Sequence, residues 1–390
     1  MKIAIEAQRV FRKKKGGMDV VALETIKHLQ KIDKENEYII YAAPGDDKSY
    51  AIQETSNFKI KILKGFTYAD WEQVWLPLQL LKDKPDILHC TSNTAPLIGS
   101  VPKVVTVHDI IYLEKRCWPV NSNLYQRFGN YYRSWVVPQV IRNAAQIITV
   151  SVFEKKNISS YFSLDEWKVK VVPNAANESF TRVADKESLD KVRKKYTLPS
   201  DYILFLGNTE PRKNMRNLIK SYSLLLKKYS DAPDLVVTNI SEEILSSILS
   251  EIDRLSIRNK ICLVGYVDFE DLPALYSLAE FFIYPSLREG FGLPLLESMA
   301  CGTPVITSSV SSMPEIAGEA ALLADPNNPE SISEAMLSYL TNVSLKHEKI
   351  QLGYQRCKEY TWLQSAKNIL EVYHSLHEFK KAAVLKVQYG

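Results

Sequence analysis

Two glutamates flank a glycine-rich turn in the C-terminal half of the chain, within "EGFGLPLLESMACGTPVITS" (residues 289–308). Gly290 and Gly292 allow backbone angles that other residues avoid, so the chain can turn sharply and bring amides close to a ligand. Pro294 and the apolar residues after it predict a short helix, with Glu297 in its first turn at the positive helix end. A helix start of this kind also suits an anion. Alone, the stretch is equally consistent with a structural turn.

A basic pair, Arg212 and Lys213, follows a predicted strand in "GNTEPRKN". The planar guanidinium and the compact ammonium both suit a diphosphate, although a solvated helix start is the plainer alternative. Gly16 and Gly17 precede the first predicted helix, where backbone amides can approach a phosphate. This loop lacks the G-x-G-x-x-G pattern of dinucleotide-binding proteins, which disfavours NAD.

A histidine, His108, ends the predicted strand "VTVHD". At a strand end it can bond a sugar hydroxyl or relay a proton, and a packed structural histidine is the alternative. No Asp-x-Asp motif is visible, so we expect no metal ion and no other cofactor. The five cysteines are scattered without a close pair, which fits a reducing compartment and argues against a zinc cluster.

The composition describes a globular protein of more than one domain. A chain of 390 residues exceeds one ordinary core, and 46% hydrophobic with 24% charged residues argues against disorder. The net charge of +4 gives no reason to expect nucleic acid as a partner. The start "MKIAIEAQ" does not resemble a signal peptide, and no apolar run reaches the length of about 18 residues that a membrane helix needs. We therefore expect a cytoplasmic protein.

Apolar runs that end in polar residues alternate with helical stretches, which predicts an α/β protein with parallel sheets. One series starts at "KIAIEA" and a second at "DYILFLGNTEPRKN", and a polar stretch around Pro173 separates them. We predict domains at residues 1–178 and 179–360 and a final helix in 361–390. Sites at strand ends in two such domains favour a ligand bound between them.

An ordered set of motifs extends over nearly the whole chain. Its members are "GG" (16–17), "VTVHD" (105–109), "VVPNAA" (171–176), "GNTEPRKN" (207–214), "LVGYV" (263–267), "YPSLREGFGLPLLESMACGTPVITS" (284–308) and "PEIAGEAALLADP" (314–326). With these motifs the chain resembles the retaining glycosyltransferases of family 4. The resemblance implies the GT-B fold, in which two Rossmann-like domains face a cleft and the C-terminal helix crosses back to the first domain.

The resemblance also implies a role for each motif. Its catalytic candidates are His108, Arg212, Lys213 and Glu289, with Glu289 near the reacting carbon and the cations facing the departing diphosphate. The implied nucleotide-sugar contacts are the Gly16–Gly17 loop, which closes on the donor, Tyr266 and Val267 at the base, Gly290, Phe291 and Gly292 at the sugar, the amides of Leu293 and Leu295 at the phosphate, and Glu297 at the ribose. Some relatives have a basic residue where this chain has Asn208, so neutralising the diphosphate rests more on Arg212 and Lys213.

The expected reaction is transfer of a hexose, mannose in the first instance, from a nucleotide diphosphate sugar to a glycan or lipid-linked acceptor in surface polysaccharide synthesis, for example of lipopolysaccharide. Preorganised cations can stabilise the leaving group without a metal. Three other classes stay open: a glycoside hydrolase, a nucleotide-sugar epimerase of similar architecture, and a non-catalytic nucleotide-sugar sensor.

Aromatic and basic residues are frequent in the first predicted domain. This mixture suits peripheral contact with the anionic surface at the inner face of the membrane. A buried aromatic core with solvated charges is the alternative. The residues are Trp71, Trp75, Lys115, Arg116, Trp118, Tyr125, Arg127, Phe128, Tyr131, Tyr132, Arg133 and Trp135.

Overall fold

The computed structural model describes residues 1–13, 16–45, 52–114 and 124–389. The chain divides into two compact units. Unit 1 comprises Met1–Asn174 together with Thr361–Gly390, and unit 2 comprises Ala175–Tyr360. The division lies four residues before the end predicted for the first domain, and the C-terminal segment belongs to unit 1.

Unit 1 is built on a parallel seven-stranded sheet with the order β3-β2-β1-β4-β5-β6-β7. In β1, Ile5 pairs with Ile40 of β2 and His89 of β4, and the consecutive residues Ala4 and Ile5 are both buried, so both faces of this central strand are covered. The strands are β1 (Lys2–Glu6), β2 (Glu37–Ala42), β3 (Phe58–Ile62), β4 (Ile87–Cys90), β5 (Lys103–Thr106), β6 (Gln146–Thr149) and β7 (Val169–Val171).

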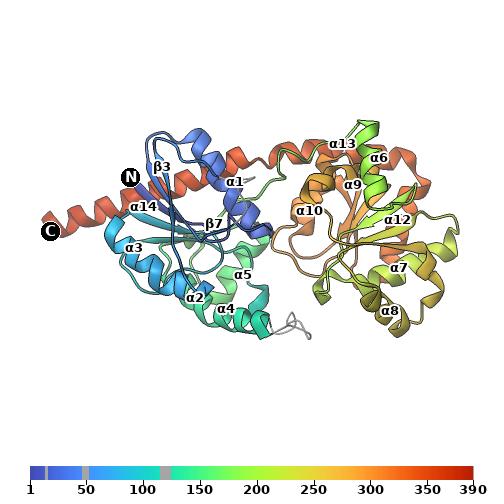
Figure 1. The fold of residues 1–390 in the computed structure, drawn as a ribbon, viewed down its shortest axis with the longest axis horizontal. Coiled ribbons are helices and arrows are strands. Elements are labelled where there is room, and N and C mark those ends of the chain that lie inside the picture. The colour runs from blue at the N-terminus through green and yellow to red at the C-terminus, as the bar shows by residue number, and fades with distance from the viewer. Residues whose placement is uncertain (14–15, 46–51, 115–123, 390) are drawn as a thin grey trace. The chain divides into compact units, whose positions relative to one another are not determined.

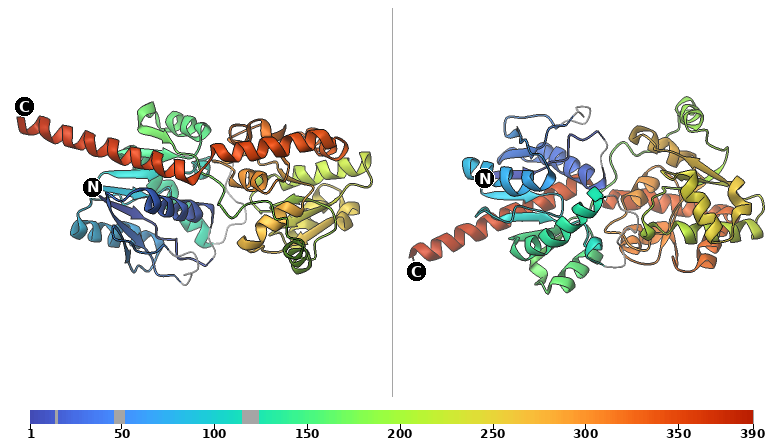
Figure 2. Two further views of the ribbon diagram at one scale, coloured as in Figure 1. Left: turned by 90° about the horizontal axis from the view of Figure 1, so that it is seen from above. Right: turned by 60° about the horizontal axis from the view of Figure 1, so that its bottom comes forward.

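Two layers of helices cover this sheet. Apolar side chains of α1 (Gly17–Ile32) and α14 (Trp362–Tyr389) share one core with the strands, and Figures 1 and 2 show α14 running beside the N-terminal strands. His89 Nδ1 lies 2.5 Å from the Tyr373 hydroxyl, which fixes α14 to β4. The opposite face is covered by the π-helical turn η1 (Trp71–Trp75), α3 (Leu76–Asp83), α4 (Leu124–Asn143) and α5 (Val152–Phe162), with α2 (Tyr68–Asp70) leading into η1.

Unit 2 repeats this architecture on a parallel six-stranded sheet with the order β10-β9-β8-β11-β12-β13. Its core includes side chains of α7 (Met215–Lys228), α8 (Glu242–Glu251) and α12 (Pro329–Thr341). Figure 1 shows α9 (Leu272–Leu278), α10 (Leu293–Ala300) and α13 (Val343–Glu359) on the other side of the sheet. The strands are β8 (Tyr202–Phe205), β9 (Asp234–Thr238), β10 (Ile261–Val264), β11 (Phe281–Tyr284), β12 (Val305–Ser308) and β13 (Ala321–Ala324), and α6 (Lys186–Lys195) and α11 (Met313–Ala317) complete the unit.

The two parallel sheets confirm the predicted α/β class and the two Rossmann-like units. In a parallel sheet all carboxyl ends of the strands lie at one edge, so each sheet gathers its post-strand motifs there. Those two edges position the site residues described next.

Candidate active site

The carboxyl edge of the unit 2 sheet brings together the loops that follow β8 and β11. The Leu287 amide donates to the Arg212 carbonyl at 2.7 Å. Asn214 adopts a left-handed backbone (φ 64°), and its side-chain amide donates to the carbonyls of Pro285 and Pro326. These bonds hold the "PRKN" segment against the glycine-rich turn, although 77 residues separate Arg212 from Glu289 in the chain.

A cluster of ion pairs occupies this junction. Glu289 Oε2 lies 2.7 Å from Arg212 Nη1, and Glu289 Oε1 lies 2.7 Å from Lys213 Nζ. Lys213 also donates to the Tyr284 hydroxyl at 2.8 Å and lies over the Tyr284 ring. Glu210 pairs with the other side of Arg212, Oε2 to Nε at 2.6 Å. The Glu289 carboxylate therefore bridges the two predicted diphosphate cations.

Burial and charge oppose each other in this cluster. Burial alone would raise the pKa of Glu289, but Lys213 and Arg212 outweigh it and hold that pKa well below the ordinary range of a glutamate. Burial would likewise lower the pKa of Lys213, and the Glu289 carboxylate raises it instead. All three groups are therefore charged at neutral pH, and the site carries a ready anion-binding pair that a carboxylate occupies in this structure.

The turn that carries Glu289 is fixed by residues that the sequence did not single out. The Glu289 amide donates to Ser311 Oγ at 3.0 Å, and the hydroxyls of Ser311 and Ser312 donate to the Glu289 carbonyl. Ser312 also donates to the Phe291 carbonyl, and buried Arg288 donates Nη1 to the Glu289 carbonyl at 3.0 Å. The Ser311–Ser312 pair, separated from the end of β12 by two residues, was the available sequence signal, since short hydroxyl side chains commonly bond nearby backbone groups.

Helix α10 starts as the glycine pattern predicted. Gly292 has φ 102°, a left-handed conformation that favours glycine, and Leu293 is the first helical residue. As a first-turn donor, the Leu293 amide has no carbonyl within the helix to bond. The Leu295 amide already donates to the Gly292 carbonyl at 3.0 Å, so a phosphate would have to share that donor.

Glu297 lies in the second turn of α10, which corrects the expected first-turn position and its interaction with the helix dipole. Its carboxylate faces the buried Tyr276, whose hydroxyl lies 3.2 Å from Oε2. Burial raises the pKa of Glu297 to about 7, and the Tyr276 bond offsets only part of that rise. The carboxyl therefore gains a proton close to neutral pH, unlike Glu289.

The predicted base-binding residues follow β10 at the same carboxyl edge. The Tyr266 side chain is 55% exposed, whereas Val267 is buried. An exposed aromatic ring beside a buried aliphatic residue offers a face on which a base can stack, so their role in base binding stays a prediction.

Unit 1 holds the other three predicted residues at its own carboxyl edge. Gly16 caps α1 with an ordinary φ of −91°, its amide donates to Asp19 Oδ2 at 2.9 Å, and Gly17 opens the helix. Asp19 is in turn paired with Arg9. The space beside Gly17 is open, since an added Cβ would meet nothing within 4 Å, and a ligand can approach this backbone.

His108 is buried at the end of β5 and its orientation is fixed. The ring Nε2 lies 2.8 Å from the Thr91 carbonyl, and the backbone amide donates to Asn93 Oδ1 at 2.7 Å. A carbonyl only accepts, so Nε2 carries the proton, and burial lowers the His108 pKa so that the ring is neutral. Nδ1 is then the acceptor nitrogen, so it can accept a hydrogen bond from a hydroxyl group but has no proton to donate. Asn93 itself has a left-handed backbone (φ 66°), a strained state common at functional sites.

Sequence profiles of two glycosyltransferase families match the two units. Residues 15–180 match Glycosyltransferase Family 4, and residues 188–356 match Glycosyl transferases group 1. The chain therefore belongs to the glycosyltransferases that combine these two domains, which are known as family 4 or group 1.

The relatives of this glycosyltransferase include named mannosyltransferases. It is 33% identical over 237 residues to O-antigen chain mannosyltransferase B of Escherichia coli, which covers 60% of this chain and 61% of the relative. It is 30% identical over 265 residues to O-antigen chain mannosyltransferase RfbU of Salmonella typhimurium, 67% of each chain. A match to the serotype-specific mannosyltransferase WbdA of E. coli, at 29% identity, covers 73% of this chain and 35% of the relative. The chain thus spans less than two thirds of the length of two of these three proteins.

Solved structures establish the GT-B fold. Sucrose-phosphate synthase from Thermosynechococcus elongatus superposes with a TM-score of 0.72 at 18% identity, covering 96% of this chain and 98% of that one. WaaG, a glycosyltransferase involved in lipopolysaccharide biosynthesis, gives 0.70 at 14% identity, covering 95% and 99%.

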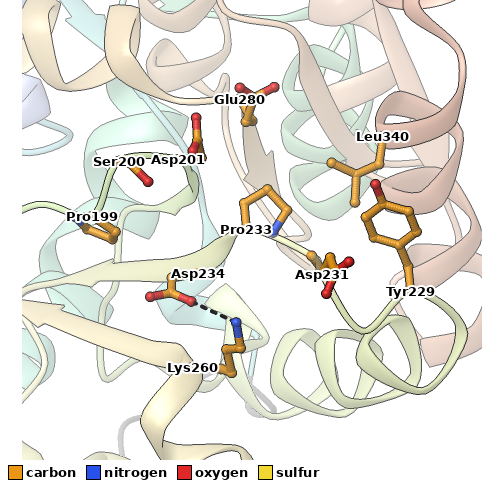
Figure 3. A pocket seen from close by; sticks show the side chains of 11 residues that line it. Pro199, Ser200, Asp201, Tyr229, Asp231, Pro233, Asp234, Lys260, Glu280 and Leu340 are labelled. Atoms are coloured by element: carbon orange, nitrogen blue, oxygen red, sulfur yellow. Dashed lines mark ion pairs between the residues drawn. The ribbon is translucent and has the colours of Figure 1, made fainter.

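A separate hollow of about 400 Å³ lies at the opposite edge of the unit 2 sheet (Figure 3). Its lining includes Asp201, Asp234 and Glu280, which stand at the amino ends of β8, β9 and β11, and Asp234 pairs with Lys260 at 3.5 Å. Ligands of open parallel sheets bind at the carboxyl edge, so this hollow is not part of the candidate active site.

Two further observations concern metals and membranes. Within residues 1–13, 16–45, 52–114 and 124–389, no three His, Cys, Asp or Glu side chains are grouped as a metal site requires. Over the same ranges, no helix has both the length and the apolar character that crossing a bilayer needs.

Proposed function

We propose that this glycosyltransferase transfers mannose, with retention of configuration and without a metal, from a nucleotide diphosphate sugar to a glycan or lipid-linked acceptor during surface polysaccharide synthesis. The single observation that carries the donor assignment is the pairing of Arg212 and Lys213 with buried Glu289 at the carboxyl edge of unit 2. Mannose is chosen because relatives at 29–33% identity bear mannosyltransferase names.

The cation pair supports a role in leaving-group stabilisation. When the bond between the sugar and the diphosphate breaks, negative charge grows on the phosphate oxygens. Of the two carboxylates that pair with Arg212 and Lys213, Glu210 is 41% exposed and screened by water, whereas Lys213 is largely buried, where its charge acts strongly. The start of α10 at Leu293 adds a helix dipole and a first-turn amide that has no acceptor within the helix. A metal ion is not needed to supply this stabilisation.

Glu289 and His108 have complementary electrostatic roles in this proposal. Glu289 stays ionised, so it can accept hydrogen bonds from sugar hydroxyls and stabilise the positive charge that develops at the reacting carbon. His108 is neutral with the proton on Nε2, so its Nδ1 can accept a bond from a sugar hydroxyl. Glu297 would accept hydrogen bonds from the ribose hydroxyls, and Tyr266 would stack on the base. The Gly16–Gly17 backbone would bind the phosphate.

The acceptor would bind at the carboxyl edge of the unit 1 sheet, where the strand order reverses between β1 and β4. Gln8 follows β1 there, and its side-chain Oε1 is buried with no hydrogen-bond partner among the described residues. Such an oxygen suits a hydroxyl donor, in keeping with a carbohydrate acceptor.

The test measures nucleotide diphosphate release with each common nucleotide sugar, in the presence of a chelator, with and without a lipid-linked or glycan acceptor. We expect release only with donor and acceptor together, a product of retained anomeric configuration by NMR, and the highest rate with a mannosyl donor. A changed sugar nucleotide without acceptor would indicate an epimerase, and donor binding without turnover would indicate a sensor. Activity restored only by magnesium or manganese would contradict the metal-free mechanism.

A further inference from the structure

One helix of unit 1 has apolar side chains on its solvent side as well as on its core side. On the core side of the continuous segment formed by η1 and α3, Trp71, Leu76 and Leu80 are at most 5% exposed. The outward side chains are the apolar face, which we define as Val74, Trp75, Leu78 and Leu81, with exposed fractions of 47%, 43%, 47% and 67%. Val74, Leu78 and Leu81 follow an i, i+4, i+7 spacing and so form one stripe along the helix.

The apolar face is held in place from behind. Trp71 Nε1 donates to the Leu63 carbonyl at 2.9 Å, and the Glu72 carboxylate accepts hydrogen bonds from Thr94 Oγ1 and the Tyr132 hydroxyl, each at 2.5 Å. Glu72 is 1% exposed, so rotating the helix to bury the stripe would expose a bonded carboxylate and Trp71. The outward apolar side chains are therefore a permanent feature of this surface.

Neighbouring segments add exposed apolar residues around the same helix. Gln73 accepts a bond from the Leu97 amide, which brings Ile98, 74% exposed, beside the turn. Tyr132 is bonded to Glu72 and lies on α4, whose outward residues Tyr131 and Trp135 are 71% and 59% exposed. Phe66, which precedes α2, is 96% exposed. Figure 1 shows α2, α3 and α4 on one side of the sheet.

The aromatic and basic residues singled out in the first predicted domain divide between the core and the surface. Trp71 is core and Tyr132 is partly buried, whereas Trp75, Tyr131 and Trp135 are exposed. Lys115, Arg116 and Trp118 lie outside the described residues, as do the side chains of Tyr125, Arg127 and Phe128. Arg133 is partly buried.

The charges at the border of the apolar face are mainly positive. Lys64, Lys82 and Lys84 are exposed on the segments that lead into and out of the helix. Asp83 forms an ion pair with Lys61 and accepts a hydrogen bond from the Tyr41 hydroxyl. Asp70 accepts a hydrogen bond from Trp75 Nε1 at 3.1 Å. Apolar residues with a tryptophan, bordered by lysines, match the boundary between lipid headgroups and acyl chains.

We infer that the apolar face docks this glycosyltransferase on a bilayer that contains anionic lipids. A second copy of the chain is the less suitable occupant, because a two-fold interface would set the lysine border of one copy against that of the other. A bilayer instead provides negative headgroups for the lysines and an apolar layer for Trp75, Leu78 and Leu81. The inference deepens the proposed function. It rests on that proposal for one point only, namely that the acceptor is presented at the bilayer surface.

The test is flotation of the full chain with vesicles of phosphatidylcholine alone or of phosphatidylcholine and phosphatidylglycerol in equal amounts. We expect binding to the anionic vesicles that falls with added salt and is weak on phosphatidylcholine alone. The double variant Leu78→Glu/Leu81→Glu should reduce the bound fraction about tenfold or more, because two apolar anchors become acidic. Leu255→Glu is the matched control, since Leu255 is 60% exposed and belongs to unit 2, not to the apolar face, and the variant should bind as the wild type does.

Turnover on a lipid-free oligosaccharide acceptor separates this inference from the proposed function. The double variant should keep the wild-type rate on that acceptor and lose rate only with a vesicle-bound one. Wild-type protein that does not float, or a double variant that floats equally well, would overturn the docking inference whatever the activity shows. A wild-type dimer in sedimentation that the double variant abolishes would overturn it as well, by assigning the face to a second copy. Absent turnover with intact vesicle binding would count against the proposed function alone.

Discussion

Glu289 Oε1 and Lys213 Nζ lie 2.7 Å apart, and both side chains are largely buried. The carboxylate proposed to act at the sugar and the ammonium proposed to act at the diphosphate are thus held as one unit before any donor binds. Removing either member leaves the other charge buried with less compensation. Substitutions here should therefore change stability as well as turnover.

Glu289→Gln keeps the shape of the side chain and removes its charge. We expect a large fall in turnover and a loss of unfolding free energy of up to about 3–5 kcal/mol, because Arg212 and Lys213 lose their buried counter-ion. Thermal unfolding without donor measures the stability. A nucleoside diphosphate should raise the midpoint of the variant more than that of the wild type, since its phosphates replace the lost anion.

Glu210→Gln is the matched control, since Glu210 also pairs with Arg212 but its side chain is 41% exposed. Its cost should be below about 1 kcal/mol, as for other surface pairs. A Glu289→Gln protein with wild-type stability and wild-type rate would show that this ion cluster has no part in catalysis.

Lys213→Ala and Arg212→Ala should each lower kcat by about 10² or more, because each removes a cation that faces charge growing in the transition state. Lys213 should have the larger effect, since its side chain is 13% exposed against 20% for Arg212 and its charge is less screened by water. Steady-state kinetics with saturating donor measures both. Lys195→Ala removes an exposed, ion-paired lysine of the same unit and should leave kcat unchanged. Equal rates in all three variants would show that Arg212 and Lys213 only hold the buried ion cluster together and have no part in catalysis.

His108→Ala should reduce kcat/KM for the donor by about tenfold, the cost of a neutral hydrogen bond of roughly 1–1.5 kcal/mol. Because burial lowers the pKa of His108 below its ordinary value, the wild-type ring should be neutral with the proton on Nε2 between pH 7 and 8. Nitrogen-15 chemical shifts of the ring report this tautomer directly. A ring that titrates within that range would instead support a proton relay.

The sequence predicted those features that depend on local chain chemistry. Gly292 was assigned a left-handed turn before a helix, and its φ of 102° confirms it. The alternation of apolar runs with polar ends predicted both parallel sheets. Strand β3 was missed because "FKIKI" is short and has lysine at two of its five positions. Helix α13 was missed because it has little apolar periodicity and only Gly353 is fully buried.

Contacts between side chains that are far apart in the chain could not be predicted from the sequence. Glu289 lies 76 residues from Lys213, and nothing in either motif shows that the two side chains meet. The contributions of Ser311, Ser312 and Arg288 to the turn likewise depend on how β12 and β11 lie side by side. The exposed side of α3 could not be foreseen either, since apolar residues on both sides of a helix are the usual pattern of a buried one.

Glu297 provides a pH-dependent prediction because burial raises its pKa from 4.5 to about 7. A raised carboxyl pKa means that the folded protein favours the protonated form, so this group destabilises the fold as pH rises from about 4.5 to 7. Ribose hydroxyls need the ionised form as acceptor. Donor affinity should therefore increase as pH rises toward 7 and level off above it. At pH 6 only about a tenth of the carboxyl is ionised, so the donor Kd should be about tenfold higher than at pH 8.

Glu297→Gln should remove this dependence while leaving the fold intact. The variant should bind donor more weakly at pH 8 by roughly 1.5–3 kcal/mol, the value of a hydrogen bond to a charged group. Its kcat should change less than its Kd, because ribose contacts are made equally in the ground and transition states. Isothermal titration calorimetry from pH 5.5 to 8.5 measures both proteins. A wild-type Kd that is flat across this range, or a variant that keeps the wild-type slope, would show that Glu297 does not bind the ribose and serves only to pack against Tyr276.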